Sequence, residues 1–465
     1  MHRSIICFLI LIFVVPIFSA SLEDAHKLGA GDQGWVATHT DGTIHVVYRS
    51  NQGNKYQKGS APDKMETATT VVPGLTDMYN PKLIVDPNGV PHLVYQKGLA
   101  GAGTTTWYTT IKDGKWIAPE KVSDSGELPD KKRSYVPDVA ADKDGNILVS
   151  VWNIDNTKYR APDNAMYRWR SPEGIWGELK SITGNTWSSL PKVEELNGGF
   201  YYLYQAASTD WKVIGPVEAG SDLSGGQAVN ALNLDVANLN EGANLDIAAD
   251  STIAVASSLR RQSDGPSGIF CSIKKEDSFD NPEYLGDLPT KHEGDMHPNI
   301  AIDEATGAIV IVFQNTATNF ASYYVYENEE WSSLQRVYPE ADDAQTAWRT
   351  GPSVADIPGP GVVISVRNGD DIYLRKLIPE GEVLSNHHQT VPQNKTVFSQ
   401  LGFIGKHTQT SVYFPSNDLY NITVSTIDGK IVGSHQQATA QTFNVSEGKY
   451  QQGLYIFDFK KVVNP

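Results

Sequence analysis

The chain has 465 residues, of which 40% are hydrophobic and 10% aromatic, and its formal net charge is −16 at pH 7. This length and composition suffice for a large buried core, while the excess of acidic residues argues against nucleic acid or an anionic membrane surface as the partner. A polyanionic ligand requires a local basic cluster that overcomes this negative charge.

The first twenty residues have the pattern of a secretory signal peptide. A basic start is followed by an apolar run over residues 5–18, and small residues end the segment at Ala20. We predict cleavage near Ala20 and a secreted or cell-surface protein that begins near Ser21. The apolar run is too short to cross a membrane and no second run follows, so no membrane span is predicted. Cleavage removes Cys7 and leaves Cys271, which excludes an intramolecular disulfide.

A strand–turn–strand pattern recurs along most of the chain. Its clearest copy is Tyr79–Tyr95, where an Asn-Gly dipeptide supplies the positive φ that a tight hairpin turn requires. Similar segments are anchored, at spacings of 47 to 56 residues, at Gly34, Pro81, Pro137, Pro191, Leu245, Pro298 and Pro352. A repeat of about 50 residues made of strands and turns is typical of a β-propeller with four strands in each blade. The sequence therefore predicts an all-β, seven-bladed β-propeller over residues 21–390, with each anchor opening an innermost strand.

Other parts of the repeat have structural interpretations. Residues 21–33 precede the first blade and are suited to supply the strand that closes the ring. A turn followed by tryptophan recurs in the outer hairpins, at Trp116, Trp176 and Trp331, and we interpret these side chains as packing between blades. His45 and His92 occupy equivalent places in the second strand of their repeats, which indicates a structural role.

The last part of the chain has a different pattern. A polar stretch at residues 381–395 reads as a linker, and we predict a small C-terminal β-sandwich over residues 391–465, with strands at 411–414, 420–425, 428–432, 441–445 and 453–457. This order of strands resembles, over about the last 65 residues, the C-terminal sorting domain of the type IX (Por) secretion system. The resemblance implies a Gram-negative bacterial protein that engages this export machinery through its C-terminal domain. The usual Asn-Pro pair before the first strand is missing, so an accessory β-sandwich is the alternative.

The residues just before each anchor mark the predicted functional site. Propellers bind ligands at the mouth of the central channel, where the innermost strands converge, and these positions combine polar, aromatic and cationic side chains. As catalytic residues we predict His297, Arg349, Tyr79 and Tyr135. As substrate-binding residues we predict Asn80, Arg133, Trp187, Asn244 and Trp348.

Residues 30–380 resemble the sialidase/BNR-like propeller superfamily. The sialidase pattern itself fits poorly, because the chain lacks an Arg-Ile-Pro motif, an intact Ser-x-Asp-x-Gly-x-Thr-Trp box and an arginine triad. The resemblance to the propeller polysaccharide lyases, such as ulvan lyases, is one of residue types. It implies that an arginine neutralises a uronate carboxylate, so that His or Tyr removes the C5 proton and protonates the leaving oxygen. In this chain the arginine would be Arg349 or Arg133. The base and acid would be His297 and either Tyr79 or Tyr135.

Each catalytic candidate has a structural alternative. For His297 this is a hydrogen bond at the start of a strand, for Arg349 a pairing with Asp356 or with a neighbouring blade, and for Tyr79 and Tyr135 packing.

No metal or other cofactor is predicted. His292 and His297, with Glu293 and Asp295 between them, do not have the spacing of a metal site that we recognise. Asp-Gly turns such as Asp144-Gly145 lack the ligand spacing of a calcium loop.

Two classes of function follow from these features. The first is a secreted carbohydrate-active enzyme, a polysaccharide lyase or glycosidase that acts on an extracellular, uronate-containing polysaccharide. The alternative is a non-catalytic propeller that binds glycan or protein at the cell surface. We expect a monomer whose partner is a polysaccharide or glycan. A pocket that gathers Arg349, His297 and a tyrosine favours the enzyme, whereas a channel filled by aromatic side chains favours the binding protein.

Overall fold

The computed structural model separates the chain into two compact units, residues 1–385 and 386–465. In the first unit it describes residues 20–73, 78–98, 104–123, 132–155, 164–184, 188–206, 210–233, 239–260, 268–274, 278–286, 298–315, 320–338 and 351–379. In the second unit, and at 132–135, 154–155, 189, 233, 239–242 and 259–260, the backbone of the strands is described without the side chains. The predicted signal peptide up to residue 19 and the predicted domain boundary at 390/391 lie outside the described residues.

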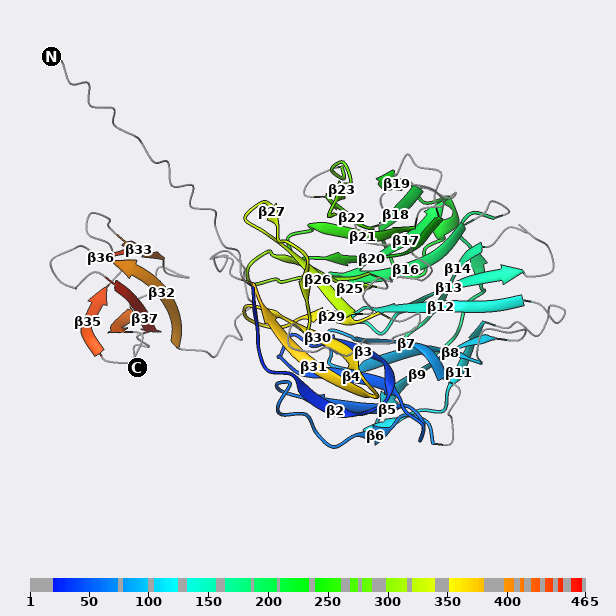
Figure 1. Ribbon diagram of the computed structural model, residues 1–465, viewed down its shortest axis with the longest axis horizontal. Coiled ribbons are helices and arrows are strands. Elements are labelled where there is room, and N and C mark those ends of the chain that lie inside the picture. Colours follow the sequence, from blue (N-terminus) through cyan, green and yellow to red (C-terminus); the bar gives the residue numbers. More distant parts are fainter. Residues whose placement is uncertain are drawn as a thin grey trace, which may run out of the picture. The chain divides into compact units, whose positions relative to one another are not determined.

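The first unit is a ring of seven antiparallel sheets, which confirms the seven-bladed propeller (Figure 1). The sheet of blade 1 contains β3 (Asp32–Thr38), β4 (Ile44–Arg49), β5 (Lys55–Gly59) and β6 (Thr69–Thr70). Blade 2 contains β7 (Met78–Val85), β8 (Pro91–Lys97), β9 (Thr105–Lys112), β10 (Lys115–Trp116) and β11 (Glu120–Ser123). Blade 3 contains β12 (Lys132–Ala141), β13 (Ile147–Asp155), β14 (Asn164–Arg170) and β15 (Lys180–Ser181).

The remaining blades repeat this order. Blade 4 contains β16 (Ser188–Leu196), β17 (Gly199–Ala206), β18 (Asp210–Val217) and β19 (Ala228–Asn233), with the short 3-10 helix η1 (Leu223–Gly225) before its last strand. Blade 5 contains β20 (Leu239–Ile247), β21 (Ile253–Arg260), β22 (Gly268–Lys274) and β23 (Glu283–Tyr284). Blade 6 contains β24 (Asn299–Ile302), β25 (Ile309–Asn315), β26 (Phe320–Glu327), β27 (Glu330–Trp331) and β28 (Gln335–Arg336). Blade 7 contains β29 (Ser353–Asp356), β30 (Val362–Asn368) and β31 (Asp371–Ile378).

The N-terminal segment closes the ring, as predicted for residues 21–33. Strands β1 (Ser21–Leu22) and β2 (His26–Ala30) pair antiparallel with β31 and form the outer edge of blade 7. In Figure 1 the blue β2 accordingly lies against the yellow β31. The guanidinium of Arg375 donates to the carbonyl oxygens of Glu23 (2.7 Å) and Val337 (2.7 Å), so it ties the closing segment to both of the last two blades.

The hydrophobic core lies between neighbouring blades. One buried cluster, for example, joins Val46 of blade 1 to Val363 and Leu374 of blade 7. Because an isolated blade would expose both faces of its sheet, each blade depends on its two neighbours for burial of apolar surface.

A repeated aromatic contact connects the first three blades. The Nδ1 atom of His45 lies 2.7 Å from the hydroxyl of Tyr56, and the ring of Trp116 from blade 2 packs edge-on against that tyrosine. His92, Tyr108 and Trp176 of blade 3 repeat the arrangement one blade further on. Both histidines are buried, so the structural interpretations of His45, His92, Trp116 and Trp176 are confirmed.

The anchor positions lie at a bulge and do not begin the strands in most blades. In blades 1 to 4 the innermost strand starts before the anchor, and its pairing with the second strand shifts register there. The residue before each of these anchors has a positive φ, from 42° to 52° in Gln33, Asn80, Val136 and Leu190. Proline suits the bulge because it lacks the N–H that a regular ladder needs. Pro298 and Pro352 directly precede β24 and β29, which agrees with the prediction for those two blades.

The second unit is a small all-β domain. Its strands are β32 (Val397–Ile404), β33 (Thr410–Tyr413), β34 (Tyr420–Thr426), β35 (Ile431–Gln437), β36 (Thr442–Val445) and β37 (Gly453–Lys461). They form one sheet in the order β32-β37-β34-β35 and a two-stranded sheet of β33 and β36. Strands lie where the sequence predicted them, and β32 is an addition. Across the described residues of both units, the structure has no helix with the length and apolar character needed to cross a membrane.

We predict that the closing segment is required for stability. A chain beginning at Gly31 lacks β1 and β2 and leaves the edge of β31 unpaired, at a cost of about 1 kcal/mol in unfolding free energy for each backbone hydrogen bond lost. Compared with a chain beginning at Ser21, it should unfold at lower temperature and aggregate more, because an open strand edge pairs with other chains. Thermal unfolding and light scattering measure both effects. Equal stability of the two chains would show that closure is dispensable.

Candidate functional site

The predicted site residues are distributed over several innermost strands. Tyr79 and Asn80 lie near the start of β7, and Asn244 lies in β20. Arg133 and Tyr135 lie near the start of β12, where the backbone alone is described. The other four predicted residues lie outside the described residues: Trp187, His297, Trp348 and Arg349. Their clustering with the tyrosines therefore stays a prediction.

The mouth of the channel holds an arginine that the sequence interpretation missed. Arg49 ends β4 and stands opposite Asp32, the first residue of β3. Its guanidinium donates through Nε to Asp32 Oδ1 (2.6 Å) and through Nη2 to Asp32 Oδ2, and it lies 4.4 Å from the centre of the Tyr79 ring. All three side chains are partly accessible. A comparison of Tyr48-Arg49 with Tyr95-Gln96, the same place in the next repeat, could have identified this position.

Side-chain amides connect neighbouring blades at the same level. The backbone N–H of Asn80 donates to Gln33 Oε1 (2.9 Å), and the side-chain amide of Asn80 donates to Gln96 Oε1 (3.0 Å). On the opposite side of the ring, Asn244 donates to Asn299 Oδ1 (2.9 Å). Asn80 is buried, and both of its hydrogen bonds go to glutamine side chains.

A second arginine and a small cavity lie where blades 6, 7 and 1 meet. The cavity is lined among others by Gln33, Gln314 and Arg367. Arg367 donates through Nη2 to Asp370 Oδ1 (3.2 Å). The close approach of these blades explains glycine at the first anchor, because a Cβ atom on Gly34 would lie 2.6 Å from the hydroxyl oxygen of Ser365.

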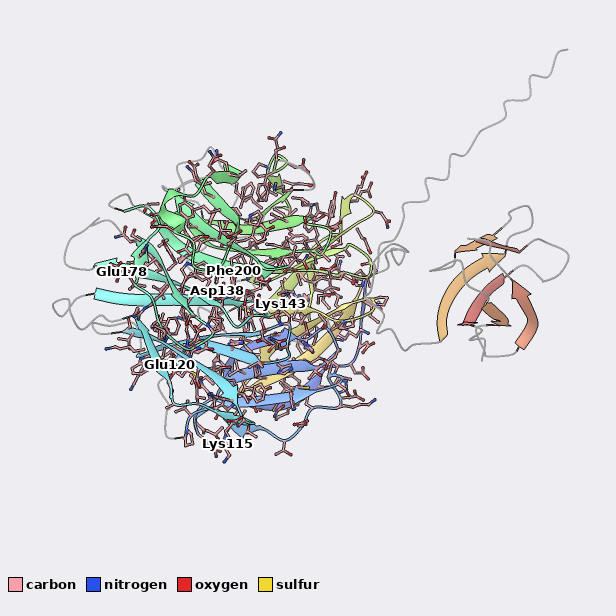
Figure 2. The ribbon with its side chains drawn as sticks, turned by 180° about the vertical axis from the view of Figure 1, so that it is seen from behind. Lys115, Glu120, Asp138, Lys143, Glu178 and Phe200 are labelled. Carbon is pink, nitrogen blue, oxygen red and sulfur yellow. The ribbon has the colours of Figure 1, made fainter. Side chains whose placement is uncertain are left out.

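The position one residue after each anchor brings charged side chains together inside the ring. Lys82, Asp138 and Lys192 hold this position in blades 2, 3 and 4, and 5%, 8% and 7% of their surfaces are exposed. The ammonium of Lys82 lies 3.0 Å from the centre of the Trp35 ring, and that of Lys192 lies 3.9 Å from Asp138 Oδ2. Figure 2 labels Asp138 near the middle of the propeller. Lys82 lies in the predicted strand–turn–strand segment Tyr79–Tyr95, but the sequence does not show that its side chain points inward.

Carboxylates gather further along the innermost strands of blades 5 to 7. Asp246 accepts from the backbone N–H of Ile302 (2.6 Å), and Asp356 accepts from that of Glu304 (3.2 Å). Removal from water, followed by the negative charge of Asp303, raises the pKa of Asp356 to about 9. Removal from water also raises the pKa of Asp246 to about 6, with a further contribution from Glu304. Among the described residues, no group of three or more His, Cys, Asp or Glu side chains is arranged to hold a metal ion.

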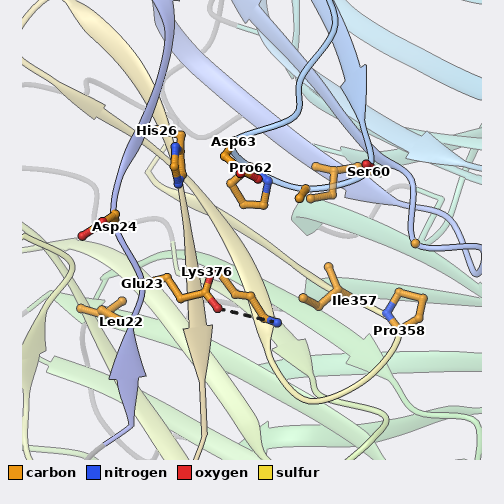
Figure 3. Close-up of a pocket in the computed structure, with 13 residues that line it drawn as sticks. Leu22, Glu23, Asp24, His26, Ser60, Pro62, Asp63, Ile357, Pro358 and Lys376 are labelled. Carbon is orange, nitrogen blue, oxygen red and sulfur yellow. Dashed lines mark ion pairs between the residues drawn. The ribbon is translucent and has the colours of Figure 1, made fainter.

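A wider cavity lies at the other end of the innermost strands. It measures about 670 Å³ and is bounded by the closing segment, by residues 60–63, and by Ile357 and Pro358 after β29 (Figure 3). Within it Lys376 and Glu23 form an ion pair at 4.0 Å. The cavity lacks the aromatic surface and the convergent amides of the mouth, so we place the candidate site at the mouth.

Comparison with known proteins gives fold-level similarity. No family model matches the chain, and no curated protein matches it. Among solved structures, it is similar to a polysaccharide lyase described as an ulvan lyase (10% identity, TM-score 0.49, covering 78% of this chain and 97% of the other). It is also similar to an α-L-arabinanase of Penicillium chrysogenum complexed with arabinobiose (11%, 0.44, 78% and 100%). A third is an Aleuria aurantia lectin in complex with α-methyl-L-fucoside (12%, 0.39, 69% and 99%). At these identities the similarities assign no activity to this chain.

The acidic side chains inside the ring predict a pH dependence of stability. The pKa of Asp356 is raised to about 9 by folding, so the folded chain binds more protons than the unfolded one. The stabilising contribution is therefore complete below the ordinary aspartate pKa and is lost as the pH rises toward 9.

Replacing Asp356 with Asn, which mimics the protonated carboxyl, should make the protein more stable than the wild type at pH 8 to 9 and similar at pH 4. Thermal unfolding across this range measures the difference, with Asp144→Asn in an exposed turn as the control. If the difference in melting temperature between the wild type and Asp356→Asn were the same at every pH, the raised pKa of Asp356 would be contradicted.

Proposed function

We propose that the protein is an exported carbohydrate-active propeller that takes an extracellular polysaccharide at the channel mouth and cleaves it as a lyase or glycosidase. The observation that carries the proposal is the contact of Arg49 with Tyr79, because it sets a guanidinium, a phenol and an aromatic face together at the mouth. Sugar rings present apolar faces and hydroxyl groups, and a site of this kind complements both.

The rigid mouth supports this proposal. The hydrogen bond between Asn80 and Gln33 links blade 2 to blade 1, and the bond to Gln96 fixes the Asn80 side chain within blade 2. Binding therefore loses little conformational entropy at these residues, which favours recognition of a weakly apolar ligand. The sequence predictions for His297 and Arg349, which precede the anchors Pro298 and Pro352, add a base and a second cation to the same proposed site.

One observation favours the non-catalytic alternative. The charge of Arg49 is already balanced by Asp32, since two guanidinium hydrogen bonds go to that carboxylate. An arginine engaged in this way is less able to neutralise a substrate carboxylate, and Arg349 would have to do so in a lyase. A glycan-binding propeller needs the aromatic face and hydrogen bonds but no such free cation.

The proposed activity is tested with a panel of anionic and neutral polysaccharides. Cleavage by β-elimination creates an unsaturated uronate that absorbs in the ultraviolet, whereas hydrolysis creates reducing ends without that absorbance. A signal in either assay supports an enzyme and distinguishes the two reactions. Binding without cleavage across the panel would replace the enzyme by the binding protein.

We predict that Arg349→Ala and His297→Ala each lower the rate of cleavage by a factor of about 10² or more, because each removes a group that acts in the transition state. Their thermal unfolding should stay close to that of the wild type. Arg168→Ala, which removes a cation from the outer part of blade 3, is the control. Full activity in both variants would move the catalytic site elsewhere, and unfolding of either would assign that residue a structural role.

Export is the second part of the proposal. It rests on the basic start and apolar run of the first twenty residues and on the resemblance of the last residues to a sorting domain. N-terminal sequencing of protein recovered from the medium or cell surface should find a start near Ser21. An intact Met1, or protein confined to the cytoplasm, would contradict it.

A further inference from the structure

Two lysine side chains from blades that are not neighbours meet inside the ring. Lys82 belongs to blade 2 and Lys192 to blade 4, and both follow their anchor by one residue. The two side chains lie within hydrogen-bond distance, and burial followed by the positive charge of Lys192 lowers the pKa of Lys82. Blade 3 separates the two strands, so their side chains can meet only if both point toward the axis of the ring. The pair therefore lies in the central channel.

The charges of this group do not balance. Lys192 has a carboxylate partner, Asp138, at 3.9 Å, which is the far limit of an ion pair. Lys82 forms no ion pair with a carboxylate of the described residues: its hydrogen-bond partner is the like-charged Lys192, and its ammonium lies against the face of Trp35. Two buried ammonium groups thus share one carboxylate. Burial of a charge without a partner is costly, so a bound counter-ion would stabilise the group considerably.

We infer that Lys82 and Lys192 form a binding site for an oxyanion, a carboxylate or a sulfate, in the channel below the mouth. The two ammonium groups donate hydrogen bonds to the anion, and Trp35 forms an apolar wall beside Lys82. Asp138 keeps Lys192 in position and limits the net positive charge. This site is the local basic cluster that an acidic protein needs in order to accept an anion.

The anion has two sources. It is either a free ion from solution or a carboxylate or sulfate substituent of a polysaccharide held at the mouth. The second source is geometrically accessible, because Tyr79 at the mouth and Lys82 lie on the same strand, on the two sides of the bulge. The site itself does not depend on the proposed function, since a free ion occupies it equally well.

Calorimetric titration of the protein beginning at Ser21 with sodium sulfate and with sodium acetate, at constant ionic strength, tests the site. We expect saturable binding of at least one anion. Lys82→Met, which keeps the length of the side chain, should weaken binding by about tenfold or more, the loss expected for a hydrogen bond to a charged group. Lys143→Met, in an exposed turn of blade 3, removes the same charge and should bind like the wild type.

Two results would overturn the inference: no saturable binding of either anion by the wild type, or equal affinity in Lys82→Met and Lys143→Met. Asp138→Asn gives an independent measurement, because removing the competing carboxylate should tighten binding. Sulfate raises the stability of proteins in general by exclusion from their surfaces, so direct binding is measured and a change in melting temperature is not used.

A second titration identifies the source. Oligosaccharides that carry uronate or sulfate are compared with neutral ones of the same length, in the presence and absence of saturating sulfate. If the substituent occupies the site, sulfate competes with the charged oligosaccharides alone and Lys82→Met weakens them selectively. If a free ion occupies it, Lys82→Met loses sulfate binding and keeps its affinity for both kinds of oligosaccharide. Both results support the anion site, and neither depends on cleavage.

Discussion

Pairing of the N-terminal segment with β31 is the contact on which the propeller depends. Each blade buries its two faces against two neighbours, and blades 1 and 7 become neighbours when the ring closes. The cluster of Val46, Val363 and Leu374 exists as a consequence of this closure. Arg375 extends the effect to blade 6 through its bonds to Glu23 and Val337. Without a disulfide among the described residues, hydrophobic burial and strand pairing supply the stability.

Bulges divide the innermost strands of blades 1 to 4 into two parts with different surroundings. Before the bulge, side chains such as Tyr79 belong to the mouth and are partly accessible. After it, Lys82, Asp138 and Lys192 point into the channel and are buried. The positive φ of Val136 is unfavourable for a β-branched residue, and its occurrence shows how strongly the neighbouring strands impose this geometry. The bulge thus lets one short strand serve both a surface site and an interior one.

The number of blades could be predicted from the sequence because each repeat is marked by residues that are close together in the chain. Asn-Gly and Asp-Gly turns, prolines and alternating apolar residues identify each hairpin from a few neighbouring positions. The spacing of the hairpins along the chain then gives the number of blades. The strand boundaries were less predictable, since the bulge at Pro81 or Pro137 depends on pairing with the next strand. Arg49 was missed for a similar reason: it is distinguished by its contact with Tyr79, a residue of another blade. Lys82 looked like an ordinary solvent-facing strand residue, because the sequence does not state which face of an innermost strand meets the axis.

The closing strand also makes closure of the ring a late step in folding. Lys27 pairs with Asp371 across a separation of 344 residues, so the first strand of the ring has to wait for the last blade. Contacts of such high sequence separation slow folding, because a long loop must be ordered before they form. Until then, a chain with six assembled blades keeps an open β-edge and an uncovered apolar face, both prone to aggregation. Assembly of the propeller is therefore completed only after the whole repeat region has emerged, and any machinery that handles the chain earlier meets a ring that is still open.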